Sequence, residues 1–160
     1  MMPQLPADVI KEIDKVLAKF PAEHRQSAVI SALMIVQKRN RGYLTTELMD
    51  QVAAYIGMPN IAVYEVASFY SMLNLKPVGR HIINLCTNVS CMLRGSEDMA
   101  KHLCKKLKID FNETTKDSKF TLRSVECLAA CGGAPMMQVD EQYHENLTPE
   151  KIDQILAKLE

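Results

Sequence analysis

The 160-residue chain is predicted to be an α+β protein in which an N-terminal helical segment precedes an α/β domain. Apolar residues recur three or four positions apart from near the start of the chain to about Leu73, which is the spacing of amphipathic helices. After the linker Lys76 to Gly79 the pattern changes to short alternating runs that are typical of strands. We therefore expect two domains, a helical bundle at residues 1–78 and a second domain at residues 79–160.

Four short helices are expected in the first domain. They cover Pro6 to Phe20, Ala22 to Asn40, Thr45 or Thr46 to Gly57, and Asn60 to Leu73. Asp8 lies in the first turn of the first helix, and Pro21 ends that helix. Gly42 is the expected C-cap of the second helix, and Asn60 the expected N-cap of the fourth.

The last two of these helices also match a helix-turn-helix, so DNA binding is an alternative for this half of the chain. A recognition helix needs side chains that donate to bases and phosphates, but residues 61–73 contain Glu65 and no Lys or Arg. The net charge of the chain is zero, which provides no electrostatic footprint for nucleic acid or anionic lipid. We expect a protein partner and no nucleic acid.

The second domain alternates strands and helices. The expected elements are a strand at Arg80 to Cys86, a helix from Ser96 to Leu107, a polar surface connection at Lys108 to Lys119, a strand at Phe120 to Val125, a hairpin of Met136 to Val139 with Gln142 to His144, and a helix opened by Thr148 and Pro149. Alternation places Ile83 and Leu85 on one face of the first strand. The order β-α-β followed by β-β-α is that of a thioredoxin-like domain.

Four of the five cysteines form two pairs, each beside the end of an expected strand: Cys86 with Cys91, and Cys127 with Cys131. A fold that sets these strands side by side brings the four thiolates to one point, which predicts a metal site. Zinc knuckles favour two to four residues between ligands, whereas iron-sulfur clusters accept four thiolates at variable spacing. The loops that carry the two cysteine pairs have room for a larger group than one ion, so we favour a 2Fe-2S cluster. The alternative is a zinc-stapled scaffold, which would help to assemble a larger complex without a redox role.

Several residues around the cysteines have more than one interpretation. The second loop is rich in small residues, Ala129, Ala130, Gly132, Gly133 and Ala134, which allow backbone N–H groups to approach a sulfide. Arg94 either offsets cluster charge, meets a partner, or is a solvated charge. Met92, Met136 and Met137 either line the cluster or fill the core. Pro135 stands where thioredoxin-like folds often have a cis-proline, and Cys104 is expected to pack in a helix core.

Three motifs together resemble the E subunit of bacterial NADH:quinone oxidoreductase, respiratory complex I. They are Phe69 to Arg80, Cys86 to Gly95, and Glu126 to Pro135. The resemblance implies a thioredoxin-like 2Fe-2S ferredoxin domain behind a helical segment. It also implies an enzyme subunit without a complete active site, which exchanges single electrons with the FMN of an NADH-oxidising flavoprotein partner. Related diaphorase-type subunits of NAD-linked hydrogenases and formate dehydrogenases are the alternative. The cluster ligands would be Cys86, Cys91, Cys127 and Cys131.

Other sequence features bear on ligands and location. The six glycines never form G-x-G-x-x-G, so we expect this chain not to bind NADH by itself. The N-terminus lacks the basic and apolar regions of a signal peptide. The longest apolar stretch, Ala28 to Val36, is far shorter than the ~20 residues that span a bilayer. We expect a cytoplasmic protein without direct membrane insertion, and the resemblance places it peripheral to the inner membrane in a larger complex.

Overall fold

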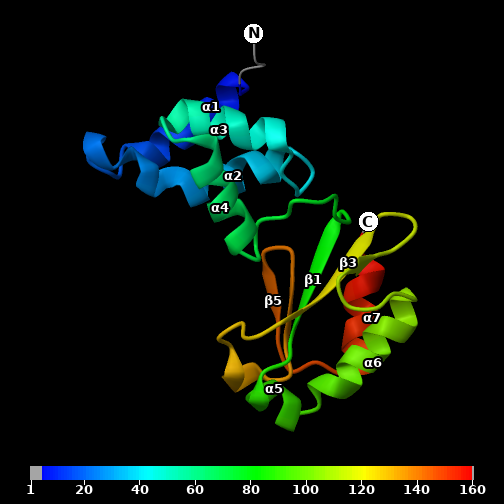
Figure 1. Cartoon of the computed structure of the whole chain (residues 1–160). Coiled ribbons are helices and arrows are strands. Elements are labelled where there is room, and N and C mark those ends of the chain that lie inside the picture. The colour runs from blue at the N-terminus through cyan, green and yellow to red at the C-terminus, as the bar shows by residue number, and fades with distance from the viewer. Residues whose placement is uncertain (1–4, 160) are drawn as a thin grey trace. The chain divides into compact units, whose positions relative to one another are not determined.

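The structure is a computed structural model that describes residues 5–159 of the chain. The chain divides into two compact units, Met1–Pro77 and Val78–Glu160 (Figure 1). Each unit has its own hydrophobic core. The first unit is helical and the second contains a mixed sheet with helices, which confirms the predicted α+β class. Within the described residues, no helix is long and apolar enough to cross a membrane.

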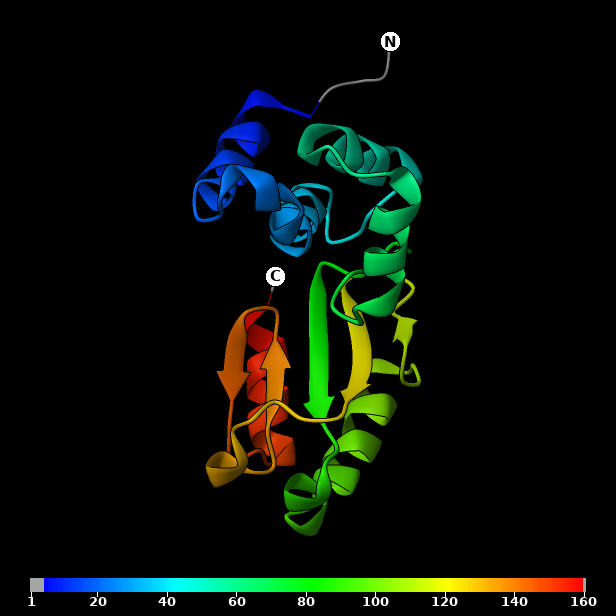
Figure 2. The same ribbon diagram turned by 60° about the vertical axis from the view of Figure 1, so that its left-hand side comes forward.

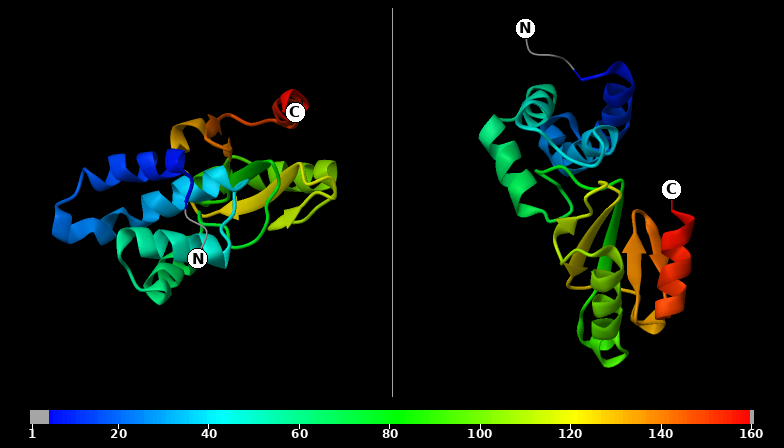
Figure 3. Two further views of the ribbon diagram at one scale, coloured as in Figure 1. Left: turned by 90° about the horizontal axis from the view of Figure 1, so that it is seen from above. Right: turned by 90° about the vertical axis from the view of Figure 1, so that its right-hand side faces the viewer.

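In its described residues, 5–77, the first unit consists of four α-helices and a 3-10 segment. They are α1 (Ala7–Leu17), the 3-10 helix η1 (Ala22–Ala28), α2 (Val29–Arg39), α3 (Thr46–Ile56) and α4 (Asn60–Phe69). The helices α1 and α2 lie side by side (Figure 3). Each α-helix contributes a fully buried apolar side chain to the core: Ile13, Leu33, Val52 and Val63.

Local signals placed α3 correctly. The Thr45 hydroxyl accepts a hydrogen bond from the N–H of Leu48, which makes it the N-cap, and Gly57 ends the helix in the left-handed region at φ 84°. The expected helix from Ala22 to Asn40 is wrong in its first part. Residues 22–28 form a 3-10 helix instead, because His24 has non-helical angles of φ −113° and ψ 28°.

Other helix ends also differ from prediction. At the end of α2 the first left-handed residue is Arg41, and the N–H of Gly42 donates to the carbonyl of Gln37 at 2.9 Å, as in a Schellman motif. The helix α4 begins at Asn60 with Pro59 as its N-cap, so Asn60 does not cap it. It also ends at Phe69 rather than near Leu73.

The second unit is built on a five-stranded sheet. Its elements are β1 (His81–Cys86), α5 (Val89–Leu93), α6 (Ser96–Leu107), β2 (Glu113–Thr114), β3 (Phe120–Val125), the 3-10 turn η2 (Cys131–Gly133), β4 (Met137–Val139), β5 (Gln142–His144) and α7 (Pro149–Lys158). The strand order is β2-β3-β1-β4-β5. The strands β1 and β3 are parallel, and the other pairs are antiparallel (Figure 2).

One face of this sheet is covered by α6 and α7. The side chains of Ile83 and Leu85, which alternation placed on one face of β1, are fully buried there. They pack in one core with Leu103 of α6 and Ile152 of α7. Figures 2 and 3 show α7 alongside the β4–β5 hairpin. This packing holds β1, and therefore its cysteine end, in a fixed position.

The expected surface connection between α6 and β3 contains an edge strand. The two residues of β2 pair antiparallel with β3, and the hydroxyls of Thr114 and Thr121 lie 2.8 Å apart. Two residues are too few to show alternation in the sequence. At the entry to β1, a Cβ on Gly79 would lie 2.7 Å from the carbonyl carbon of Phe120, so only glycine allows the chain to pass this closely beside β3.

Candidate metal centre

The cysteine pairs meet at the carboxyl end of the two central parallel strands. Cys86 is the last residue of β1, and it lies opposite Val125, the last residue of β3. Cys127 follows two residues after the end of β3, and η2 begins at Cys131. Figure 1 shows α5 at this same end of the sheet. The parallel register therefore brings residues some forty positions apart to one edge, as the sequence predicted.

The four thiols form a chain of neighbours. The thiols of Cys91 and Cys127 are close enough to that of Cys86 to influence its pKa, and the thiol of Cys131 influences the pKa of Cys91. In the described part of the chain, no three His, Cys, Asp or Glu side chains are grouped closely enough to hold one metal ion. Ligation of one cluster by all four thiols therefore stays a prediction.

The two pairs differ in exposure. Cys86 and Cys91 are buried, with 3% and 1% of their surface exposed, whereas Cys127 and Cys131 are exposed. Cys91 lies on the short helix α5, where a loop was expected. The missed signal is Asn88, whose side-chain oxygen accepts a hydrogen bond from the N–H of Val89 at 2.8 Å and begins the helix.

Backbone donors point at the sulfur atoms. Burial acts against the Cys86 thiolate, but hydrogen bonds from the backbone of Asn88 and Leu128 and from two thiols outweigh it, so the pKa of Cys86 lies below its usual value. The N–H of Ala129 donates to the sulfur of Cys127 at 3.3 Å. Burial, together with the hydrogen bond to Cys86, raises the pKa of the Cys91 thiol to about 11. An anionic sulfur cluster requires such N–H donors.

The two glycines of the second loop have different roles. A Cβ on Gly132 would meet no heavy atom within 4 Å, so this side of the loop is open. A Cβ on Gly133 would lie 2.1 Å from a carboxylate oxygen of Glu145 and 2.5 Å from its Cβ. Gly133 therefore allows the cysteine loop to pack against the segment before α7, whereas the open side at Gly132 leaves space for a larger group.

The methionines near the cysteines and Cys104 lie in different surroundings. Met136 is fully buried in a small cluster with Cys86 and Cys91, so it lines the site, whereas Met137 belongs to the core of the sheet. Met92 is 44% exposed. Cys104 packs against the sheet core from α6, which confirms its predicted packing role.

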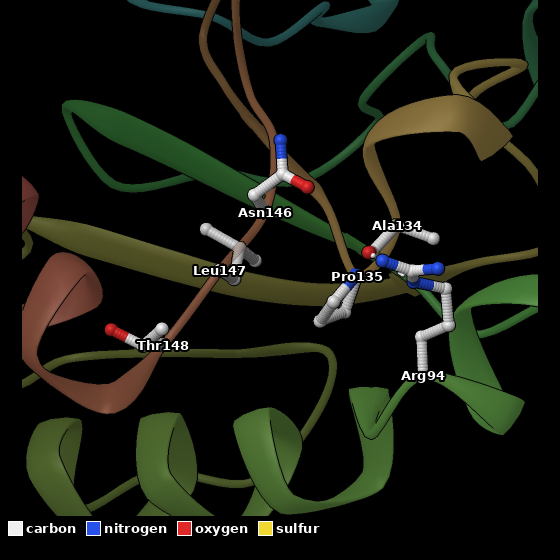
Figure 4. A pocket seen from close by; sticks show the side chains of 6 residues that line it. All are labelled: Arg94, Ala134, Pro135, Asn146, Leu147 and Thr148. Carbon is white, nitrogen blue, oxygen red and sulfur yellow. Dashed lines mark hydrogen bonds between the residues drawn. The ribbon is translucent and has the colours of Figure 1, made fainter.

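Arg94 is not a free surface charge. Its Nε donates to the carbonyl of Ala134 at 2.9 Å, and the following peptide bond, Ala134–Pro135, is cis. Beside it lies an open cavity of about 430 Å³ (Figure 4). The residues that line it are Arg94, Ala134, Pro135, Asn146, Leu147 and Thr148.

Comparison with known proteins identifies the family. Residues 13–160 match the family described as Thioredoxin-like [2Fe-2S] ferredoxin. The chain belongs to this family. The predicted thioredoxin-like fold and the 2Fe-2S cofactor are thereby confirmed, and the donor set of four thiols with N–H groups directed at sulfur fits that cluster.

Named relatives confirm the resemblance seen in the three motifs. The E subunit of NADH-quinone oxidoreductase from Rickettsia bellii (strain RML369-C) is 44% identical over 146 residues, which cover 91% of this chain and 87% of that protein. The NADH dehydrogenase [ubiquinone] flavoprotein 2, mitochondrial, of Dictyostelium discoideum is 44% identical over 137 residues, or 86% of this chain and 56% of that protein. These relatives are subunits of an oxidoreductase complex.

A solved structure shares the fold. The crystal structure of an NAD+-reducing [NiFe]-hydrogenase in the H2-reduced state matches with a TM-score of 0.69 and 20% sequence identity. The match covers 79% of this chain and 22% of the hydrogenase chain. This thioredoxin-like 2Fe-2S protein therefore has the same fold as about a fifth of a longer redox protein.

Proposed function

We propose that this chain is an electron-transfer subunit of an NADH:quinone oxidoreductase and that four cysteines hold its single 2Fe-2S cluster. Cys86 and Cys91 would hold one iron, and Cys127 and Cys131 the other. The observation that carries the proposal is the placement of these thiols together at the carboxyl end of β1 and β3, with the N–H of Ala129 directed at the sulfur of Cys127. When bound, the cluster supplies one-electron redox chemistry.

The proposed cluster site has one buried side and one exposed side. The buried pair, Cys86 and Cys91, packs with Ala134 and Met136 and keeps water away from one side of the site. The exposed pair, Cys127 and Cys131, borders the surface. We infer that an electron donor or acceptor approaches on the exposed side, because that pair is the one in contact with solvent.

The proposed partner is an FMN-bearing, NADH-oxidising flavoprotein subunit of the same complex. A hydride delivers two electrons together, whereas a 2Fe-2S cluster accepts one, so a flavin must stand between NADH and this chain. The sequence has no dinucleotide fingerprint that would hold NADH. The names of the bacterial relatives support this assignment, and the complex would place the chain in the cytoplasm, peripheral to the inner membrane.

The test is reduction of the purified chain under anaerobic conditions. The protein should be brown and contain iron and sulfide, whereas a zinc-stapled scaffold would be colourless. Adding NADH to the isolated chain should leave the oxidised visible spectrum unchanged, and dithionite should deliver one electron per cluster. NADH together with the flavoprotein partner should also be able to deliver one electron to the cluster. Rapid bleaching of the flavin-free chain by NADH alone would contradict the proposed division of roles between the two subunits.

A further inference from the structure

The cysteine on α5 and the cysteine on η2 are joined through Arg94. The backbone N–H of Arg94 donates to the carbonyl of Cys91 at 3.1 Å, and its Nε donates to the carbonyl of Ala134 at 2.9 Å. The N–H of Ala134 in turn donates to the carbonyl of Cys131 at 3.2 Å. Three hydrogen bonds thus connect one cysteine of each pair, across forty positions of sequence between Arg94 and Ala134.

The segment that Arg94 holds also contacts the first cysteine pair directly. Two residues after Ala134, the carbonyl of Met136 accepts a hydrogen bond from the N–H of Cys86 at 3.2 Å. Ala134 is only 1% exposed, so its carbonyl depends on protein donors, and losing the guanidinium bond would leave a buried acceptor without that partner.

The hydrogen bond also fixes a positive charge near the site. Arg94 is three residues after Cys91 and one residue beyond the end of α5, which places it about one helical turn from the cysteine. The guanidinium carries a positive charge, and its Nε makes the bond to Ala134. A four-thiolate 2Fe-2S cluster becomes more negative on reduction, so a cation held at this position stabilises the reduced state more than the oxidised state.

We propose that Arg94 is a positioning residue of the cluster site, which ties the two cysteine loops together through Ala134 and raises the reduction potential with its charge. This inference rests on the proposed ligation by the two cysteine pairs. It assigns two separable roles to one side chain: the Nε–H bond holds the loops, and the guanidinium charge favours the added electron.

Three substitutions separate these roles by the chemistry of the side chain. Gln places its amide nitrogen on the same side-chain carbon as the Arg Nε, so Arg94→Gln keeps a donor for Ala134 and removes the charge. Arg94→Lys keeps the charge but has a methylene where Nε was. Arg94→Met keeps the aliphatic bulk and removes both. The matched control is Arg80→Gln, an exposed Arg at the opposite end of β1, roughly 20 Å from Cys86.

The measurements are the rate of iron release to a chelator, the midpoint potential from a dithionite titration, and the electron paramagnetic resonance spectrum of the reduced protein. Arg94→Met and Arg94→Lys should release iron roughly tenfold faster than wild type, which is the usual scale for losing such an outer partner, whereas Arg94→Gln should release it at the wild-type rate. Arg94→Gln and Arg94→Met should have a more negative potential, and Arg94→Lys should keep the wild-type value. Arg80→Gln should change neither quantity.

Wild-type iron release in Arg94→Met, or a wild-type potential in Arg94→Gln, overturns the proposal. Arg94→Gln keeps the hydrogen bond, so it tests the charge even if Arg94→Met folds poorly. Failure of the proposed ligation looks different, because Cys127→Ser would then keep a full 2Fe-2S cluster. A normal cluster in wild type with unchanged Arg94 variants would overturn this inference alone.

Discussion

Replacement of Cys127 by Ser separates cluster ligation from folding better than replacement of the buried cysteines. Cys86 and Cys91 are 3% and 1% exposed and pack with Met136, so their loss would disturb the core as well as any metal. The side chain of Cys127 is exposed, and exposed substitutions usually change the free energy of unfolding by less than about 0.5 kcal/mol. We therefore expect Cys127→Ser to fold as apo-protein with unchanged stability.

The iron content of Cys127→Ser should fall from two irons per chain to a small fraction, since serine offers no thiolate to iron. The control is Cys104→Ser, which alters a half-buried thiol whose pKa is raised by burial on α6. It should keep its full iron content and lose about 1 kcal/mol or less in the free energy of unfolding.

The assay combines iron and sulfide analysis, visible absorption, and urea denaturation of the apo-proteins. Equal iron loss in both variants, or full iron content in Cys127→Ser, would refute the ligand assignment. A large loss of apo-protein stability in Cys127→Ser would instead show that this thiol has a structural role despite its exposure.

Two further predictions concern the units and the loop. Residues 79–160 alone should bind the cluster, because all four proposed ligands and every strand of the described residues lie there, while residues 1–75 serve mainly to dock the partner. A folded fragment of residues 79–160 that cannot be reconstituted with iron and sulfide would contradict this division. Gly133→Ala should cost about 1–3 kcal/mol of unfolding free energy in the apo-protein, because its Cβ would overlap the side chain of Glu145. Gly132→Ala, the control, should leave apo-protein stability unchanged. Equal stability of the two variants in a urea titration would show that the loop relaxes freely.

Much of the second unit could be predicted from local signals. The limits of β3, the β4–β5 hairpin and the Thr148 N-cap of α7 follow from alternation, turn residues and capping, which act over a few neighbouring residues. Local patterns did not predict features that depend on contacts between residues distant in the sequence. The edge strand β2 exists because β3 offers it a partner, and Phe69 is 80% exposed although it follows the buried Val63 at helical spacing.

Residue type and spacing predicted a metal site from the chain alone, and the family match confirms the 2Fe-2S cofactor. The exposure of each pair, the chain of thiol contacts and the donors on sulfur depend on how β1 and β3 align in space. The role of Arg94 shows the difference most clearly. Its sequence neighbours suggested a charge near a cluster, but its partner, the carbonyl of Ala134, lies forty residues away. Only the folded backbone brings that acceptor within reach, since a hydrogen bond requires contact and sequence spacing carries no information about such distant contacts.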